Sequence, residues 1–130
     1  MKLKYLPMVV LLYMVPNVCK ADPIDKIAAL IGQGNAHEIA RFFAPSVDIA
    51  VLENANVYSK TQAEVILEKF FKDNKPQSVA ILHRVNSNAN YNFGVVLLHT
   101  DKGKFRVAYT MKEVEKEMVI IEMRIEIEKT

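Results

Sequence analysis

The chain has 130 residues, with 17 lysine and arginine residues against 15 aspartate and glutamate residues, and it contains one cysteine. This length is enough for one domain with one modest core and excludes two domains. The charges are nearly balanced and form no basic stripe, which argues against a nucleic-acid-binding protein.

Residues 1–21 are typical of a signal peptide. Lys2 and Lys4 give a positive start, and the apolar run from Leu6 to Val15 that follows is too short to span a bilayer, which takes about 20 residues. We predict cleavage before Asp22 and export to the periplasm. The alternative is a lipoprotein acylated at Cys19.

Removal of this segment changes the chemistry of the chain. The remaining domain, residues 22–130, has no cysteine, which excludes disulfides and thiolate catalysis. Lys2, Lys4 and Lys20 leave with the segment, so 14 basic residues remain against 15 acidic ones, a formal net charge of −1. We expect no membrane span and no cofactor.

Two short helices are predicted at the start of this domain. Asp22 is a suitable N-cap before Pro23 at the first helical position, and Asn35 with Glu38 forms the pattern of a capping box for the second helix. The first helix has apolar residues at helical spacing, namely Ile24, Ile27, Ala28 and Ile31.

A longer helix is predicted after a strand at 47–52 and a brief returning strand at Val57-Tyr58. Ser59 is its N-cap and Gln62 the N3 residue of a capping box, and Asn74 ends it. Its buried stripe is expected to contain Ala63, Ile66, Leu67, Phe70 and Phe71. Ser59 is therefore predicted to stabilise the start of the helix and not to act as a nucleophile.

Four strands are predicted in the remainder, at 78–86, 91–101, 104–113 and 118–128, joined by links short enough for antiparallel hairpins. Two sets of alternating apolar residues face one side: Phe105, Val107, Tyr109 and Met111, then Val119, Ile121, Met123, Ile125 and Ile127. The predicted class is α+β, a cone-like curved antiparallel sheet with the long helix and the two short N-terminal helices on its concave face.

This order of elements resembles the nuclear-transport-factor-two-like (cystatin-like) class. The chain also contains a set of motifs spread along its length: Phe42-Phe43, Val57-Tyr58-Ser59-Lys60, Gln62-Ala63-Glu64, Ile66-Leu67, Phe70-Phe71, His83, Tyr91, Gly94, Phe105-Arg106-Val107 and Arg124-Ile125-Glu126. In these motifs the chain is similar to a family of small exported bacterial proteins known only as a domain of unknown function. This resemblance implies the cone fold and export, and it implies no activity.

Enzymes of this cone class use an acid or base inside the hollow. His83 alternates with the apolar Val79, Ile81 and Val85, and Asp48 lies in the first strand, so these two are the candidates for an isomerase or hydro-lyase type of enzyme. The histidines are too scattered for a metal site.

A binding or interaction module is the leading prediction. Tyr58, His83 and Tyr109 are the polar residues best placed to orient a small apolar ligand in the cone. The alternative partner is another protein, or a second copy joined through the sheet, bound by a charged surface of Arg106, Arg124, Glu122 and Glu126.

Overall fold

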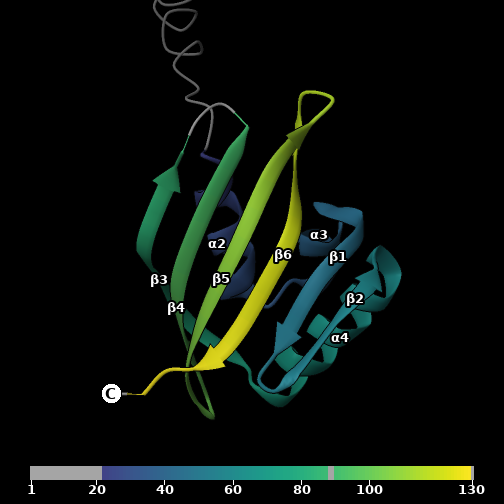
Figure 1. Cartoon of the computed structure of the whole chain (residues 1–130). Helices are drawn as coiled ribbons and strands as arrows, with labels where there is room; N and C mark the ends of the chain where they lie inside the picture. The colour runs from purple at the N-terminus through teal and green to yellow at the C-terminus, as the bar shows by residue number, and fades with distance from the viewer. Residues whose placement is uncertain (1–21, 88–89, 130) are drawn as a thin grey trace, which may run out of the picture.

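The computed structural model describes residues 22–87 and 90–129 (Figure 1). The predicted signal peptide and Cys19 lie outside the described residues. The described part forms one six-stranded sheet in the order β2-β1-β6-β5-β4-β3, with helices along one side of it (Figure 1). None of these helices is both long and apolar enough to cross a membrane.

The elements follow the predicted order closely. The helices are α2 (Pro23–Gln33), α3 (Ala36–Ala40) and α4 (Lys60–Asp73). The strands are β1 (Phe43–Val51), β2 (Asn54–Ser59), β3 (Pro76–Asn86), β4 (Tyr91–Thr100), β5 (Gly103–Val114) and β6 (Glu117–Ile127). The α+β class with a curved sheet and a long helix is therefore confirmed.

The predicted helix caps at Asp22 and Ser59 are present. Asp22 accepts a hydrogen bond from the backbone N–H of Ile24 at 2.8 Å. Ser59 Oγ accepts from Gln62 N–H while Gln62 Oε1 accepts from Ser59 N–H, each at 3.2 Å, which is the reciprocal capping box. This junction fixes where α4 leaves β2.

One strand pairing differs from the prediction of a wholly antiparallel sheet. The last four strands form antiparallel hairpins as predicted, but β1 pairs with β6 in parallel, for example Ile49 opposite Met123. These two residues are far apart in sequence, and a local hairpin pattern carries no information about such a pairing.

The core fills the space between the helices and the sheet. Its fully buried side chains come from α2, α3, α4 and from the covered face of every central strand; they include Ile24, Ile27, Ile39, Phe43, Leu67, Leu98, Tyr109 and Met123. All core residues of the described part lie between Ile24 and Ile125.

Two bulges change which residues face the core. In β3, Ile81 pairs with Val96 and His83 with Val95, so Leu82 is an extra residue and the alternation shifts by one position. A similar irregularity in β6 leaves Ile121 unpaired and buries Ile120. The prediction that Val119 and Ile121 share the core face with Met123 is therefore wrong.

Candidate functional site

The three residues predicted to bind a ligand do not lie together. Tyr109 is fully buried in β5, and its hydroxyl donates a hydrogen bond to the carbonyl of Ile24 at 2.7 Å. Burial raises the pKa of the Tyr109 hydroxyl well above its ordinary value, and the negative charges of Asp25 and Asp22 raise it further. Tyr109 therefore joins α2 to the sheet.

His83 lies on the opposite face of the sheet from the helices. The bulge at Leu82 turns its side chain to solvent beside Val95, and the inward position passes to Arg84, which forms an ion pair with Asp25 of α2. The predicted inward placement of His83 is wrong, because a one-residue bulge reverses the alternation that supported it.

Tyr58 and Asp48 also lie apart. Tyr58 is half-buried beside α4, whereas Asp48 is exposed on the uncovered face and pairs in register with Glu122. His83 is exposed as well, so neither candidate base is enclosed. No group of three metal-ligating side chains occurs among residues 22–87 and 90–129.

The four residues predicted as an interaction surface do share one face. Arg106, Arg124, Glu122 and Glu126 all lie on the face that the helices leave uncovered. We call these four residues the charged ladder. Arg124 Nη1 lies 3.8 Å from Glu122 Oε2.

Arg106 has a partner that the sequence did not suggest. Its Nε lies 3.0 Å from Oε1 of Glu128, beyond the end of β6, although Glu126 is its register partner. The hydrogen bond and the negative charge of Glu128 raise the pKa of Arg106, and the hydrogen bond from Arg106 lowers the pKa of Glu128.

An apolar strip lies beside the charged ladder. We call Val85, Tyr91, Phe93, Val95 and Leu97 the sheet strip. Val85, Tyr91 and Phe93 keep 46%, 40% and 37% of their surface exposed, and Val85 and Phe93 are register partners on adjacent strands. Apolar residues on both faces of β4 were the signal in the sequence that could have located this strip.

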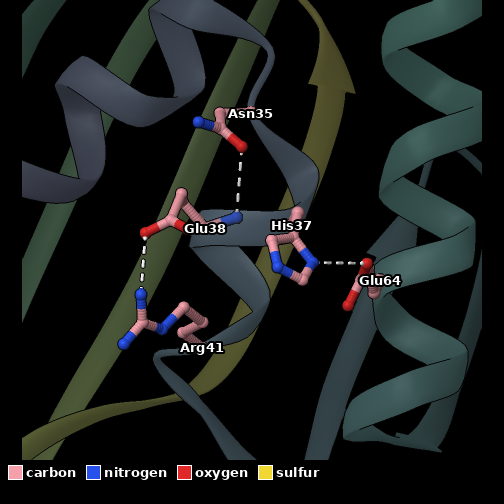
Figure 2. A network of polar contacts seen from close by, with 5 residues as sticks. All are labelled: Asn35, His37, Glu38, Arg41 and Glu64. Atoms are coloured by element: carbon pink, nitrogen blue, oxygen red, sulfur yellow. Dashed lines mark hydrogen bonds and ion pairs between the residues drawn. The ribbon is translucent and has the colours of Figure 1, made fainter.

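A polar network links the two helices nearest β1 (Figure 2). His37 Nδ1 lies 3.1 Å from Glu64 Oε2, which joins α3 to α4. Asn35 caps α3 by accepting from Glu38 N–H at 3.2 Å, but the Glu38 carboxylate binds Arg41 at 3.3 Å. The predicted capping box at Asn35 is thus half formed, and this exposed network has a structural role.

Two surface clefts involve predicted residues. The larger, about 710 Å³, contains two members of the charged ladder; it is lined by Leu52, Glu53, Arg106, Glu126, Ile127, Glu128 and Lys129. The second, about 340 Å³, contains Tyr58 and is bounded by α4 and the β1–β2 hairpin.

Solved structures share this fold at low sequence identity. A DUF4783 family protein from Bacteroides uniformis is 23% identical, with a TM-score of 0.79, over 84% of this chain and 100% of its own. A domain of unknown function with a cystatin-like fold from Nostoc punctiforme is 10% identical, with a TM-score of 0.64, over 80% of this chain and 72% of its own. A structure described as Rd1NTF2_04 with long sheet is 15% identical, with a TM-score of 0.63, over 78% and 94%.

These neighbours confirm the nuclear-transport-factor-two-like, cystatin-like fold. No functionally curated protein matches the sequence. The model of the family described as domain of unknown function, DUF4783, matches residues 24–126, which include every strand pairing described above. The chain therefore belongs to the DUF4783 family.

Proposed function

We propose that this protein is an exported interaction module that binds a second copy of itself through the uncovered face of its sheet. The observation that carries the proposal is the sheet strip. Val85, Tyr91 and Phe93 are large apolar side chains, and each leaves more than a third of its surface in water. A contiguous exposed apolar patch on a small protein is typical of an interaction site.

The filled core favours an interaction surface over a ligand held inside the cone. Tyr109, Phe43 and Leu67 are fully buried between the helices and the sheet. The Tyr109 hydroxyl is already bonded to Ile24. Of the two faces of the sheet, the outer one is therefore the face that remains available to a protein partner.

Charge alternation favours a second copy as the partner. Along β6 the outward residues are Glu122, Arg124 and Glu126, so negative and positive side chains alternate. A copy related by twofold symmetry presents the same row in the reverse direction, and a shift of one rung places Arg124 opposite Glu122 of the copy. The sheet strips of the two copies then pack together beside the paired charges.

The isomerase or hydro-lyase alternative has weaker support. A general base works in a site that excludes water. His83 and Asp48 are both exposed, and they belong to strands at opposite sides of the sheet order.

The test is the mass of residues 22–130 in solution, measured by sedimentation equilibrium over a range of concentrations. We expect a monomer–dimer equilibrium that Phe93→Lys shifts toward monomer, since it places a charge in the sheet strip. Val65→Lys is the control, because Val65 is 59% exposed on α4, away from the strip. A wild type that stays monomeric at roughly millimolar concentration, or a Phe93→Lys dimer as tight as wild type, refutes the proposal.

Export is tested separately. The intact mass and N-terminal sequence of the protein recovered outside the cytoplasm are expected to begin at Asp22. A chain that retains Met1 contradicts export by this route, and an acylated Cys19 replaces it with the lipoprotein alternative.

A further inference from the structure

The cleft beside Tyr58 has the size and the lining of a small-molecule binding site. It lies between the C-terminal half of α4 and the β1–β2 hairpin and has a volume of about 340 Å³, within the range of ligand pockets, about 300–1,000 Å³. We call it the α4 cleft. Its apolar residues include Ile49, Val51, Leu52, Ile66 and Phe70, of which Ile49 and Phe70 belong to the buried core. An apolar group of a ligand in the cleft therefore contacts side chains that the packing of the core holds in position.

The rim of the cleft carries two opposite charges. Lys69 and Asp73 lie one turn apart on α4 and both line the cleft. The spacing is that of a stabilising helical ion pair, yet neither side chain forms an ion pair with any of the described residues. An ammonium group and a carboxylate are thus both available at one rim.

Neutral polar groups complete the rim. The Tyr58 hydroxyl takes part in none of the hydrogen bonds of the described residues, and its half-buried ring lines the cleft. Asn74 uses its amide N–H to bind the carbonyl of Phe70 at 3.0 Å, which ends α4 and leaves its side-chain oxygen as an acceptor. A ligand therefore meets both a donor and an acceptor beside the two charges.

The hairpin that closes the cleft holds a strained leucine. Leu52 has a φ of 57°, in the left-handed region, which is unfavourable for a residue other than glycine. It is 46% exposed and lines the cleft. Glycine suits this turn position better, so the leucine contributes apolar surface to the rim and not turn stability.

We propose that the α4 cleft binds a small zwitterion with an apolar side chain, an aliphatic or aromatic α-amino acid. Its carboxylate pairs with Lys69, its ammonium group pairs with Asp73, and its side chain rests on Phe70 and Ile66. A ligand with a single charge leaves one rim group without a partner. This site lies beside α4 and the β1–β2 hairpin, so the inference is independent of self-association through the sheet.

The test is a titration of ¹⁵N-labelled residues 22–130 with L-leucine, followed by the backbone amide shifts of residues 66–74. We expect saturable shifts with leucine. Two analogues, 4-methylpentanoate without the ammonium group and 3-methylbutylamine without the carboxylate, are each expected to bind at least about tenfold more weakly, as loss of one charge pairing implies.

Variants separate a site from a charged surface. Lys69→Gln and Asp73→Asn are each expected to weaken leucine binding at least about fivefold, while Lys72→Gln, a change on the same helix outside the α4 cleft, leaves it unchanged. Three results overturn the proposal: no saturable shift of these amides with leucine or phenylalanine, analogues that bind as tightly as leucine, or an equal effect of Lys72→Gln.

Discussion

The two faces of the sheet are built from the same strands and have opposite properties. In β6, Met123 and Ile125 face the helices and are essentially inaccessible, whereas their neighbours Glu122, Arg124 and Glu126 face solvent. The covered face carries mainly aliphatic and aromatic side chains, and the buried hydroxyl of Tyr109 on this face is bonded to Ile24. The covered face accounts for the fold, and the uncovered face is free to differ for function.

The uncovered face is itself divided. The half formed by β3 and β4 carries the sheet strip, and the half formed by β5 and β6 carries the charged ladder. Stability alone gives no reason to keep Phe93 and Tyr91 partly exposed. If the two faces have separate roles, substitutions on the covered face are expected to change stability far more than substitutions on the uncovered face.

The largest difference in stability is expected between substitutions at two adjacent residues of β6. Ile125→Ala removes a side chain that is 1% exposed, so we expect it to lower the free energy of unfolding by about 2–5 kcal/mol. Arg124→Ala changes the other face, and an effect within about 0.5 kcal/mol is expected. Urea denaturation at a concentration that keeps the protein monomeric measures both; similar losses for the two variants would contradict the division.

A smaller loss of stability is expected for a substitution at Gly94, because the covered face has no room for a side chain at this position. A Cβ atom at this position lies 2.8 Å from Ile24 Cγ2 and 3.0 Å from the Tyr109 ring. Gly94→Ala is therefore expected to lower the free energy of unfolding by about 1–3 kcal/mol through overpacking. Ala108→Val adds carbon atoms on the uncovered face of β5 and is the control in the same denaturation experiment. A denaturation midpoint of Gly94→Ala equal to that of wild type would contradict the prediction.

Tyr109 gives the covered face a pH dependence. Its pKa is raised in the folded state, so the unfolded chain loses this proton first, above its ordinary pKa of about 10. The stabilisation is complete below that pH and is lost as the pH rises above it. Unfolding free energies measured from pH 9 upward are expected to fall less steeply in Tyr109→Phe than in wild type; equal slopes would show that the hydroxyl does not hold its proton in the fold.

Glu128, on the uncovered face, makes the stability of the fold depend on pH more weakly than Tyr109 does and in the opposite direction. Its pKa is lowered in the folded state by Arg106. Its contribution is present above its unfolded pKa of about 4.3 and is lost as the pH falls through the lower folded value. In thermal melts between pH 5 and 2, the melting temperature of Glu128→Gln is expected to fall slightly less with decreasing pH than that of wild type. Glu126→Gln, at an exposed position without this hydrogen bond, is the comparison.

Local signals in the sequence were sufficient for most of the fold. Asp22 and Ser59 cap their helices through bonds between neighbouring residues, and a short link such as Asp101–Gly103 specifies a hairpin. The pairing of β1 with β6 depends on residues far apart in the chain. The bulge at Leu82 shifts the alternation of β3 by one position, and the residue types along this strand do not indicate it.

The candidate site was less predictable for the same reason. The inward placement of His83 failed at the bulge, while the outward placement of the charged ladder held because alternation in β5 and in the second half of β6 is unbroken. Tyr58 lies in the α4 cleft, apart from His83 and Tyr109, and its neighbours Lys69 and Asp73 have the i,i+4 spacing of a helical ion pair. The structure leaves them apart at the rim of the α4 cleft.

The most direct measurement of the central claim is the distance between spin labels in the proposed dimer of residues 22–130. The described residues contain no cysteine, so Thr110→Cys places one label per copy on the uncovered face and Lys72→Cys places one on α4. Two packed sheets lie about 10 Å apart. Labels at 110 are therefore expected to be separated by little more than this spacing plus their own lengths, and labels at 72 by much more. Labels at 72 that lie closer together than those at 110 would contradict an interface made by the uncovered face of the sheet.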